Sequence, residues 1–427
     1  LDIAVDQMEA APLMVCSAMG GVTDQIIKSY TLAESGDIDD ARTVLDSIKE
    51  RHYACAEDFL EGELLKSMQT DLDSTFAQFA SLLKGVNLLR DCSPRSKDAL
   101  LSFGERLSTR LIYARGIQRG IKTILLDARE LIRTDDNFNS ARPDMEATFR
   151  LVSESVRPEP GTLIITQGFI GTGNNGVTTT LGRGGSDYSA SILGAALGAE
   201  EIQIWTDVNG IMTCDPRIIP QAATISDITY LEAGELAFFG AKVVHPATIQ
   251  PAVSHGIPVL VKDTGAPHEK GTRIAAGAGE PGLKALSAKK GITVVSITSS
   301  RMLEAHGFLR RIFAIFDAAE TPVDLVTTSE VSVSVTIDKT DALEGILEKL
   351  EALGQVTVES GQAILCMVGR DLWKDPVFPA KAFGALEHIP VRMISLGASE
   401  VNLSVVVPEQ KVEEALKSLH RRFFEDQ

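Results

Sequence analysis

The chain has 427 residues, enough for two or three domains that each bury a hydrophobic core. Its formal net charge of −17 disfavours nucleic acid and anionic membranes as partners, because an acidic surface repels both. Five scattered cysteines, no apolar run of membrane-spanning length and no signal peptide predict reduced thiols and a cytoplasmic protein. A plastid location stays open, because a removed transit peptide would leave no trace. Seven dispersed histidines without ligand spacing predict no metal site.

Residues 1–275 read as an α/β domain. Apolar, β-branched runs alternate with helical patterns, which favours a mostly parallel sheet between helices. The predicted strands are residues 12–17, 122–127, 161–166, 201–206 and 257–262. A long polar, helix-rich stretch at 24–118 separates the first two strands, and we expect it to cap one end of the sheet.

The remainder of the chain repeats one pattern twice. Gly, Pro and Ala are enriched around a predicted linker at 276–290. Beyond it, the order strand–helix–strand–strand–helix occurs once in 291–355 and again in 356–427, with similar segments at 329–335 and 399–405. This repetition predicts two small α+β modules.

Common nucleotide motifs do not explain the chain. No G-x-x-x-x-G-K-[ST] motif occurs, which excludes a P-loop kinase. One G-x-G-x-x-G motif is present at Gly171, Gly173 and Gly176, but the residues after it are Val177 and three threonines. Such residues favour an extended chain rather than the helix that a dinucleotide-binding fold requires, so we predict a hairpin loop.

The strongest local signal is TTTLGRGGSDYSA at 178–190. Glycines around Arg183 permit a tight loop that approaches a ligand closely. Ser186 and Asp187 are suitable N-cap residues for the helix that follows. Free amides at that helix start, with Arg183 beside them, would form an anion site. A glycine-rich turn with a capped helix and a surface arginine is the alternative reading.

This segment closely resembles the substrate loop of the aspartokinases, which belong to the amino-acid kinase superfamily. Four further stretches resemble the same family in the same order: LLSFGERLSTRL at 100–111, WTDVNGIMTCDPR at 205–217, ELAFFGAKVVHPAT at 235–248 and VDLVTTSEVSVSV at 323–335. The pattern is most similar to the monofunctional, lysine-inhibited type. The resemblance implies an amino-acid kinase domain at 1–275, followed by two ferredoxin-like ACT modules.

The resemblance also implies an activity and its partners. The enzyme would phosphorylate the side-chain carboxylate of L-aspartate with ATP and Mg²⁺. Lysine would inhibit it through the ACT modules, which would also pair into a homodimer or tetramer. Two alternatives stay open: a sibling kinase acting on glutamate or acetylglutamate, and an amino-acid sensor without catalysis.

The resemblance implies that the amino-acid substrate is bound by the residues at the matching family positions, which are Ser17, Thr23, Glu105, Arg183, Gly184, Gly185 and Ser186. Arg183 would hold a substrate carboxylate bidentately, and Glu105 would pair with the substrate ammonium. Asp187 would lie near the phosphate, orienting the transferred group or holding Mg²⁺ through water.

The resemblance assigns the nucleotide to Thr206, Asp207, Met212, Arg217 and Lys242. Met212 stands where related enzymes commonly carry tyrosine, and it would still pack against a purine. The effector is assigned to Met302, Gly307, Phe308, Leu309, Val323, Asp324, Thr328, Ser329 and Glu330. Asp324 would be the carboxylate partner of the effector's ammonium.

The chain departs from the family in one respect. Aspartokinases begin with a strand that ends in Lys-Phe-Gly-Gly-Thr-Ser, whose lysine and glycine amides bind the phosphates. These 427 residues contain no such motif. We therefore expect the sequence as printed to be without this phosphate clamp and without one inner strand of the sheet.

Overall fold

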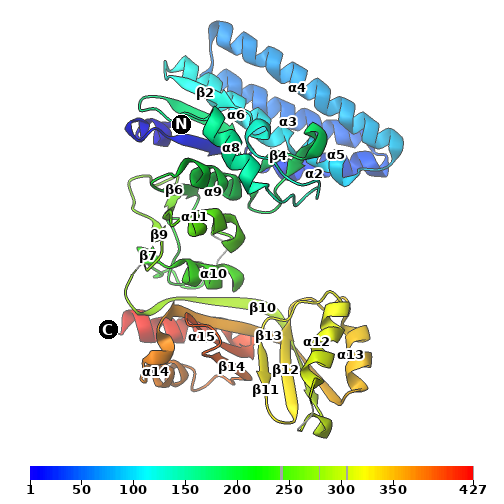
Figure 1. Ribbon diagram of the computed structural model, residues 1–427, viewed down its shortest axis with the longest axis vertical. Helices are drawn as coiled ribbons and strands as arrows, with labels where there is room; N and C mark the ends of the chain where they lie inside the picture. Colours follow the sequence, from blue (N-terminus) through cyan, green and yellow to red (C-terminus); the bar gives the residue numbers. More distant parts are fainter. Residues whose placement is uncertain (241–243, 278, 304–305, 427) are drawn as a thin grey trace. The chain divides into compact units, whose positions relative to one another are not determined.

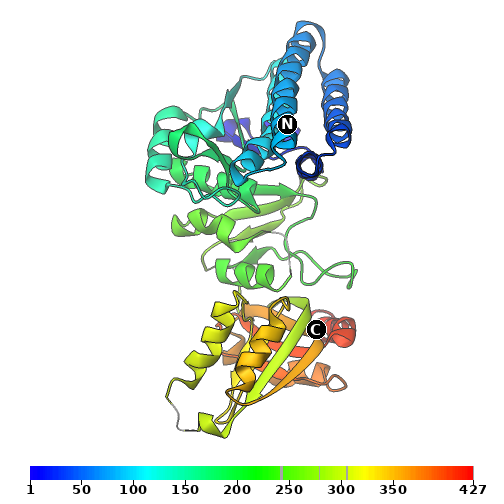
Figure 2. The ribbon, with the colours of Figure 1, turned by 90° about the vertical axis from the view of Figure 1, so that its right-hand side faces the viewer.

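The structure is a computed structural model that describes residues 1–240, 244–277, 279–303 and 306–426 (Figures 1 and 2). The chain divides into two units, Leu1–Ile204 with Ala247–Val259 and Trp205–Pro246 with Leu260–Gln427. The division falls within strands β6 (Ile202–Thr206) and β8 (Val259–Asp263). Each unit is described separately below.

The first unit is built on a small parallel sheet of order β1-β3-β2. Its strands are β1 (Leu13–Cys16), β2 (Thr123–Leu126) and β3 (Leu163–Gln167). All five residues of the central strand β3 are buried, which accounts for its continuous apolar run. Ile164 contributes to one hydrophobic cluster and Ile165 to another, so both faces of the sheet are covered. The three predicted strands in this unit are confirmed.

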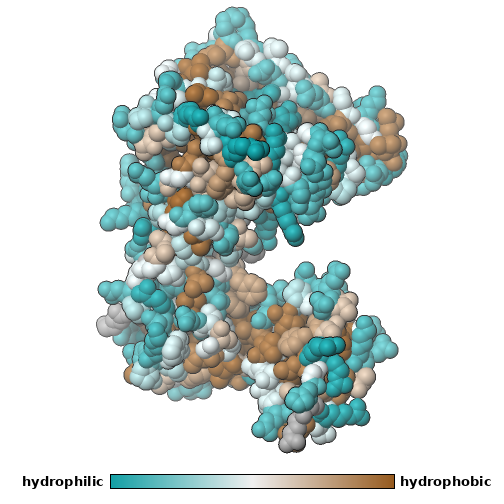
Figure 3. All heavy atoms as spheres, viewed as in Figure 1, coloured by the Kyte–Doolittle hydropathy of each residue, from teal (hydrophilic) through white to brown (hydrophobic). Residues whose placement is uncertain are grey.

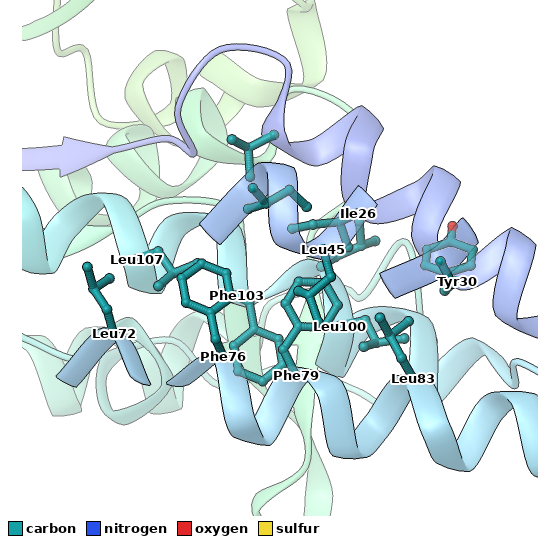
Figure 4. Packing of buried hydrophobic residues seen from close by; sticks show 14 of the residues in the cluster. Ile26, Tyr30, Leu45, Leu72, Phe76, Phe79, Leu83, Leu100, Phe103 and Leu107 are labelled. Atoms are coloured by element: carbon teal, nitrogen blue, oxygen red, sulfur yellow. The ribbon is translucent and has the colours of Figure 1, made fainter. Parts of the chain in front are cut away.

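Five helices form the insertion between β1 and β2: α2 (Val22–Ser35), α3 (Ile38–Phe59), α4 (Gly62–Leu89), α5 (Pro94–Leu101) and α6 (Phe103–Gln118). Figures 1 and 2 show α3 and α4 side by side. The rings of Phe79 and Phe103 stack with centroids 4.9 Å apart and join α4 to α6 (Figure 4). Because α6 packs on this cluster and also on β2 and β3, it connects the helical insertion to the sheet.

The glycine motif after β3 forms a hairpin, as predicted. Strands β4 (Ile170–Thr172) and β5 (Thr178–Thr180) pair in antiparallel fashion around the turn at Asn174–Gly176. Helix α9 (Gly185–Leu197) follows the hairpin. The remaining longer helix of this unit, α8 (Met145–Ser155), packs against α9.

The second unit begins in a four-stranded sheet of order β6-β8-β9-β7, with β7 at Asp227–Ile228 and β9 at Thr272–Ile274. Strands β6 and β8 confirm two more predicted strands. Helix α10 (Tyr230–Phe238) begins with a capping box, in which Thr229 and Glu232 satisfy each other's backbone amides.

The C-terminal part of the second unit is a six-stranded antiparallel sheet of order β11-β12-β10-β13-β15-β14. The strands are β10 (Gly282–Thr298), β11 (Val326–Thr328), β12 (Ser332–Ile337), β13 (Gln355–Arg370), β14 (Met393–Leu396) and β15 (Asn402–Pro408). The helices are α12 (Phe308–Ala318), α13 (Leu343–Glu351), α14 (Phe378–Ala385) and α15 (Val412–His420). The predicted strand–helix–strand–strand–helix order therefore occurs twice.

Two strands are much longer than the repeat requires. Residues 293–298 of β10 pair with β12, while residues 282–289 pair with the second half of β13. We expected residues 282–290 to belong to the linker, but all of them belong to β10. The enrichment of Gly, Pro and Ala around these residues predicted a linker, whereas their pairing with residues 364–370 makes them a strand.

None of the helices within the described ranges is both long enough and apolar enough to cross a membrane.

Candidate active site

Glu105 is a buried carboxylate with an incomplete set of partners. It lies in the first turn of α6 and is only 4% exposed. Its Oε1 accepts a hydrogen bond of 3.2 Å from the Ala18 amide, in the loop after β1. Its Oε2 is buried, and no donor to it exists in the described part of the chain. Burial raises the pKa of Glu105 to about 7, against the lowering effect of the backbone hydrogen bonds.

A short network of polar side chains holds Glu105 in place. The Ser108 hydroxyl donates to the Ser17 carbonyl at 2.7 Å, which ties α6 to the loop after β1. The Thr109 hydroxyl donates to the Glu105 carbonyl at 2.8 Å and accepts from Gln167 Nε2 at 2.9 Å. Because Gln167 ends β3, the sheet itself fixes this turn of α6. Sequence reasoning missed Gln167, although a polar residue ending a buried strand was the available signal.

The glycine-rich loop begins helix α9 earlier than predicted. Gly184 is the N-cap, with a left-handed φ of +69°, and the helix starts at Gly185. The prediction that Ser186 and Asp187 cap the helix is therefore wrong, because glycine adopts this conformation without strain. Both residues lie in the first turn instead. Their amides have no acceptor within a helix at these positions and remain available to an anion.

The turn after β3 packs tightly against the start of α9. A Cβ atom added to Gly168 would lie 2.7 Å from the Ser186 Cβ, and one added to Gly185 would lie 2.6 Å from the Phe169 ring. Phe169 adopts a positive φ of 68°, and its amide donates to the Ser189 hydroxyl at 3.0 Å. These contacts place the first turn of α9 directly beside the end of β3, the edge at which ligands of α/β sheets bind.

Asp187 and Arg183 differ in environment. Burial is the cause that raises the pKa of Asp187 to about 6, and this carboxyl makes no ion pair within the described residues. Arg183 is exposed and likewise makes no ion pair there. Ser17 is also exposed, and Thr23 is half-buried in the first turn of α2. A desolvated carboxyl and an unpaired guanidinium therefore lie within one segment of five residues.

A cavity of about 650 Å³ lies in the first unit between α4, α5, α6 and β5. Arg106, next to Glu105 in sequence, lines it together with Ser102 and Thr178. Burial lowers the pKa of Arg106 to about 10, and the nearby charges of Arg129 and Arg110 add to this effect. None of the residues predicted to bind the amino-acid substrate lines this cavity.

The residues predicted to bind the nucleotide belong to the second unit. Thr206 ends β6, and its hydroxyl donates to Asp207 at 3.2 Å. Arg217 forms an ion pair with the Asp215 carboxylate, in which Nη2 donates to Oδ2 at 2.7 Å. Met212 packs against the hydrophobic cluster that also contains residues of α14 and α15. Lys242 lies outside the described residues.

The predicted effector residues gather around the start of α12 and the β11–β12 turn. Met302, Phe308 and Val323 share one hydrophobic cluster, and Gly307 is the N-cap of α12. Leu309 is exposed. Thr328 ends β11, the Ser329 amide donates to the Ser332 carbonyl across the turn, and Glu330 is exposed.

Asp324 precedes β11 and is the most buried charged group of this set. Its side chain is 3% exposed, and Oδ1 accepts from Lys289 Nζ at 2.8 Å. Its Oδ2 is buried, and none of the described residues donates to it. Burial raises the pKa of Asp324, while Lys289 acts in the opposite direction.

Sequence comparisons agree with this arrangement. The profile of the amino acid kinase family matches residues 2–263, and an ACT domain profile matches residues 295–347 and 365–423. Lysine-sensitive aspartokinase 3 of Escherichia coli is 38% identical over 428 residues, covering 97% of this chain and 92% of that protein. The chain belongs to the aspartokinases. Chloroplastic aspartokinase 1 of Arabidopsis thaliana is 36% identical, covering 99% of this chain and 77% of that protein.

Solved aspartokinase structures support the same assignment. E. coli aspartokinase III in complex with aspartate and ADP superposes with a TM-score of 0.81 and 37% identity, covering 98% of this chain and 97% of that one. The same enzyme in complex with lysine and aspartate gives a TM-score of 0.80. The predictions of an amino-acid kinase fold followed by ACT modules, and of an aspartokinase, are confirmed.

Proposed function

We propose that the chain phosphorylates L-aspartate with ATP, giving 4-phospho-L-aspartate and ADP. The observation that carries this proposal is Glu105, a buried carboxylate with one oxygen lacking a donor, held beside the loop after β1. A free buried carboxylate oxygen is costly unless a cation joins it, and the ammonium of an amino acid meets that need.

The remaining charges of aspartate have partners of matching chemistry. Arg183 supplies an unpaired, exposed guanidinium that fits a carboxylate bidentately. The amides of Ser186 and Asp187, at the start of a 13-residue helix, add positive potential for anionic groups. The reaction joins two anions, so neutralising charge and aligning the reactants is the main task of these groups.

Asp187 is suited to a divalent cation held through water and the nucleotide. Its carboxyl is desolvated and has no cationic partner among the described residues. Across the same residues, no group of three or more His, Cys, Asp and Glu side chains could hold a metal alone. Bound Mg²⁺ would neutralise phosphate charge, and Asp187 would orient it through a water molecule.

For the nucleotide we propose Thr206, Asp207, Met212, Arg217 and Lys242. Strand β6 ends at Thr206, the position where ligands of open α/β sheets collect. Arg217 would have to share its guanidinium with Asp215 or leave it, since these two side chains are already paired. ADP is present in the related E. coli complex, which supports ATP as the donor.

We further propose that lysine inhibits the enzyme at the ACT modules 291–355 and 356–427, and that these modules pair in a homodimer or tetramer. The E. coli relative was solved with lysine bound. Large apolar side chains are exposed on the sheet edges, including Val326 at 39% and Ile394 at 47%. Figure 3 shows hydrophobic residues gathered over β11 to β13. Exposed apolar surface of this kind supports an interface between copies.

A substrate panel tests the activity directly. The purified protein is assayed for ATP turnover with aspartate, glutamate and N-acetylglutamate, trapping acyl phosphates with hydroxylamine. We expect product with aspartate alone. Turnover with glutamate or N-acetylglutamate would assign a sibling kinase. No turnover with any substrate, together with retained lysine binding by calorimetry, would make the chain a sensor instead.

A further inference from the structure

We propose that Lys289 is a built-in competitor of the inhibitory amino acid. Its ammonium occupies Asp324 when no effector is bound, and Asp338 receives it when the effector takes Asp324. These two residues would thus set both the lysine concentration needed for inhibition and the preference for a cationic effector. The inference rests on the proposed regulation by lysine through Asp324.

Lys289 lies on β10 and contacts three groups at once. Its Nζ is 2.8 Å from Asp324 Oδ1 and 2.9 Å from Asp338 Oδ2. The same ammonium lies 4.8 Å from the centroid of the Phe238 ring, at the end of α10. The side chain of Lys289 is 20% exposed, so its interactions are partly shielded from water. The Lys289 ammonium therefore occupies the position at Asp324 that the ammonium of a bound amino acid would take.

The cluster contains fewer cations than anions. Two carboxylates, Asp324 and Asp338, share the single ammonium of Lys289. Asp324 Oδ2 is buried and receives no donor within the described chain. A buried carboxylate oxygen without a donor favours any ammonium that can reach it. The two carboxylates can balance two ammonium groups, which in the proposed inhibited state are Lys289 on Asp338 and the effector on Asp324.

Exchange between the two ammonium groups leaves neither one unpaired. When an effector ammonium takes Asp324, Lys289 keeps Asp338 and the Phe238 ring. Asp338 is 34% exposed, so it remains partly solvated and able to accept a redirected Lys289. Removing one partner of a buried ion pair is strongly destabilising when the other is left alone, and this arrangement avoids that state.

The same arrangement explains selection by charge. An ammonium on the effector can replace the Lys289 ammonium at Asp324, because the two groups have the same charge and hydrogen-bonding capacity. The side-chain hydroxyl of threonine and the side-chain thioether of methionine carry no charge and cannot replace it. Because every amino acid carries an α-ammonium, the selection requires that the side-chain ammonium of the effector takes Asp324. A cationic side chain on the effector is therefore selected at Asp324.

Two substitutions should shift inhibition in opposite directions. Lys289→Met removes the competitor, so half inhibition should need roughly five- to tenfold less lysine, within the usual range of allosteric couplings. Asp338→Asn weakens the alternative partner and confines Lys289 to Asp324, so more lysine should be needed by a similar factor. Lys290→Met is the matched control, because Lys290 is adjacent on β10 and its ion pair is with Glu413.

The measurement is a lysine titration of kinase activity for wild type and the three variants, with turnover before addition of lysine reporting correct folding. Opposite shifts for Lys289→Met and Asp338→Asn, with no shift for Lys290→Met, would support the proposal. A higher lysine requirement for both variants would mean that Lys289 only positions Asp324, and would overturn it. A wild-type enzyme insensitive to lysine would instead overturn the proposed regulation, and this inference with it.

Discussion

At the scale of single residues, Glu105 makes the most direct prediction. Glu105→Gln keeps the shape of the side chain but removes its charge, so the KM for aspartate should rise by about tenfold or more. A hydrogen bond between charged groups contributes about 1.5–3 kcal/mol, which corresponds to that factor. The KM for ATP should stay within twofold, roughly the scatter of a surface substitution. Steady-state kinetics check both values.

Glu146→Gln serves as the control, because Glu146 is an exposed acid in the first turn of α8. If Glu105→Gln raised the KM for ATP and left the KM for aspartate unchanged, the assignment of Glu105 to the amino-acid substrate would be wrong.

Arg183→Lys tests the shape of the partner as well as its charge. A lysine keeps the positive charge but cannot form the planar, bidentate contact of a guanidinium. We expect kcat/KM for aspartate to fall by roughly tenfold or more in Arg183→Lys and further in Arg183→Ala. Equal values for wild type and Arg183→Lys would show that only the charge matters at this position.

The pKa of Glu105 predicts a pH dependence for aspartate use. Because burial raises this pKa to about 7, Glu105 is largely neutral at pH 6 and cannot pair with the substrate ammonium. We expect kcat/KM for aspartate to rise as pH increases through about 7, where the carboxylate forms. In Glu105→Gln this inflection should disappear, and the one from Asp187 near 6 should remain. A full pH profile of both proteins decides the assignment.

At the scale of secondary-structure elements, the contact between the end of β3 and the start of α9 positions the substrate loop. Gly168→Ala would place a methyl group 2.7 Å from the Ser186 Cβ, so the helix start must move. We expect a loss of about 1–3 kcal/mol in the free energy of unfolding, with a lower kcat/KM for aspartate. Denaturant melts and kinetics measure the two effects.

Gly85→Ala is the matched comparison, because Gly85 lies inside α4 and an added Cβ would meet no atom within 4 Å outside its own stretch of helix backbone. This substitution should stabilise the protein by about 0.5–1 kcal/mol. A Gly168→Ala protein as stable and active as wild type would show that the tight contact does not constrain α9.

Elements with a strong local signal were predictable from the sequence. Continuous apolar runs located β1, β2, β3, β6 and β8, because buried parallel strands require them. The predicted caps of α9, Ser186 and Asp187, lie two and three residues after the observed cap Gly184, because the left-handed conformation of Gly184 depends on the loop around it. Residues 282–290 were read as a linker, because their partner strand lies about 80 residues further along the chain.

The candidate site was predictable to a similar extent. The motif residues Glu105 and Arg183 could be named, but the burial of Glu105 and its free oxygen could not. The role of Lys289 could not be predicted from the sequence, because Asp324 and Asp338, which it contacts, lie 35 and 49 positions further along the chain. Such pairings arise from strand register, which no local pattern encodes. That the sequence as printed is without the phosphate clamp of Lys-Phe-Gly-Gly-Thr-Ser, and without one inner strand, stays a prediction.

At the scale of the whole molecule, catalysis and regulation should be separable. The residues proposed for aspartate lie in the first unit, and Asp324 lies in the second. Asp324→Ala should keep near-normal turnover without lysine and need roughly tenfold more lysine for half inhibition. Titrations with lysine, threonine and methionine check this. Unchanged lysine sensitivity would show that the effector binds at a site without Asp324. Inhibition by threonine alone would show that threonine, and not lysine, is the effector.

The length of β10 and β13 has a consequence for any attempt to transplant the regulatory half. Residues 282–289 pair with 364–370, and residues 294–298 pair with both β12 and the first half of β13. A cut between the two modules would remove a central strand from each and expose two new sheet edges, which are prone to aggregate. The two modules follow one another in the sequence, but they share one continuous six-stranded sheet. A chimera that borrows this sensor must take residues 282–427 together.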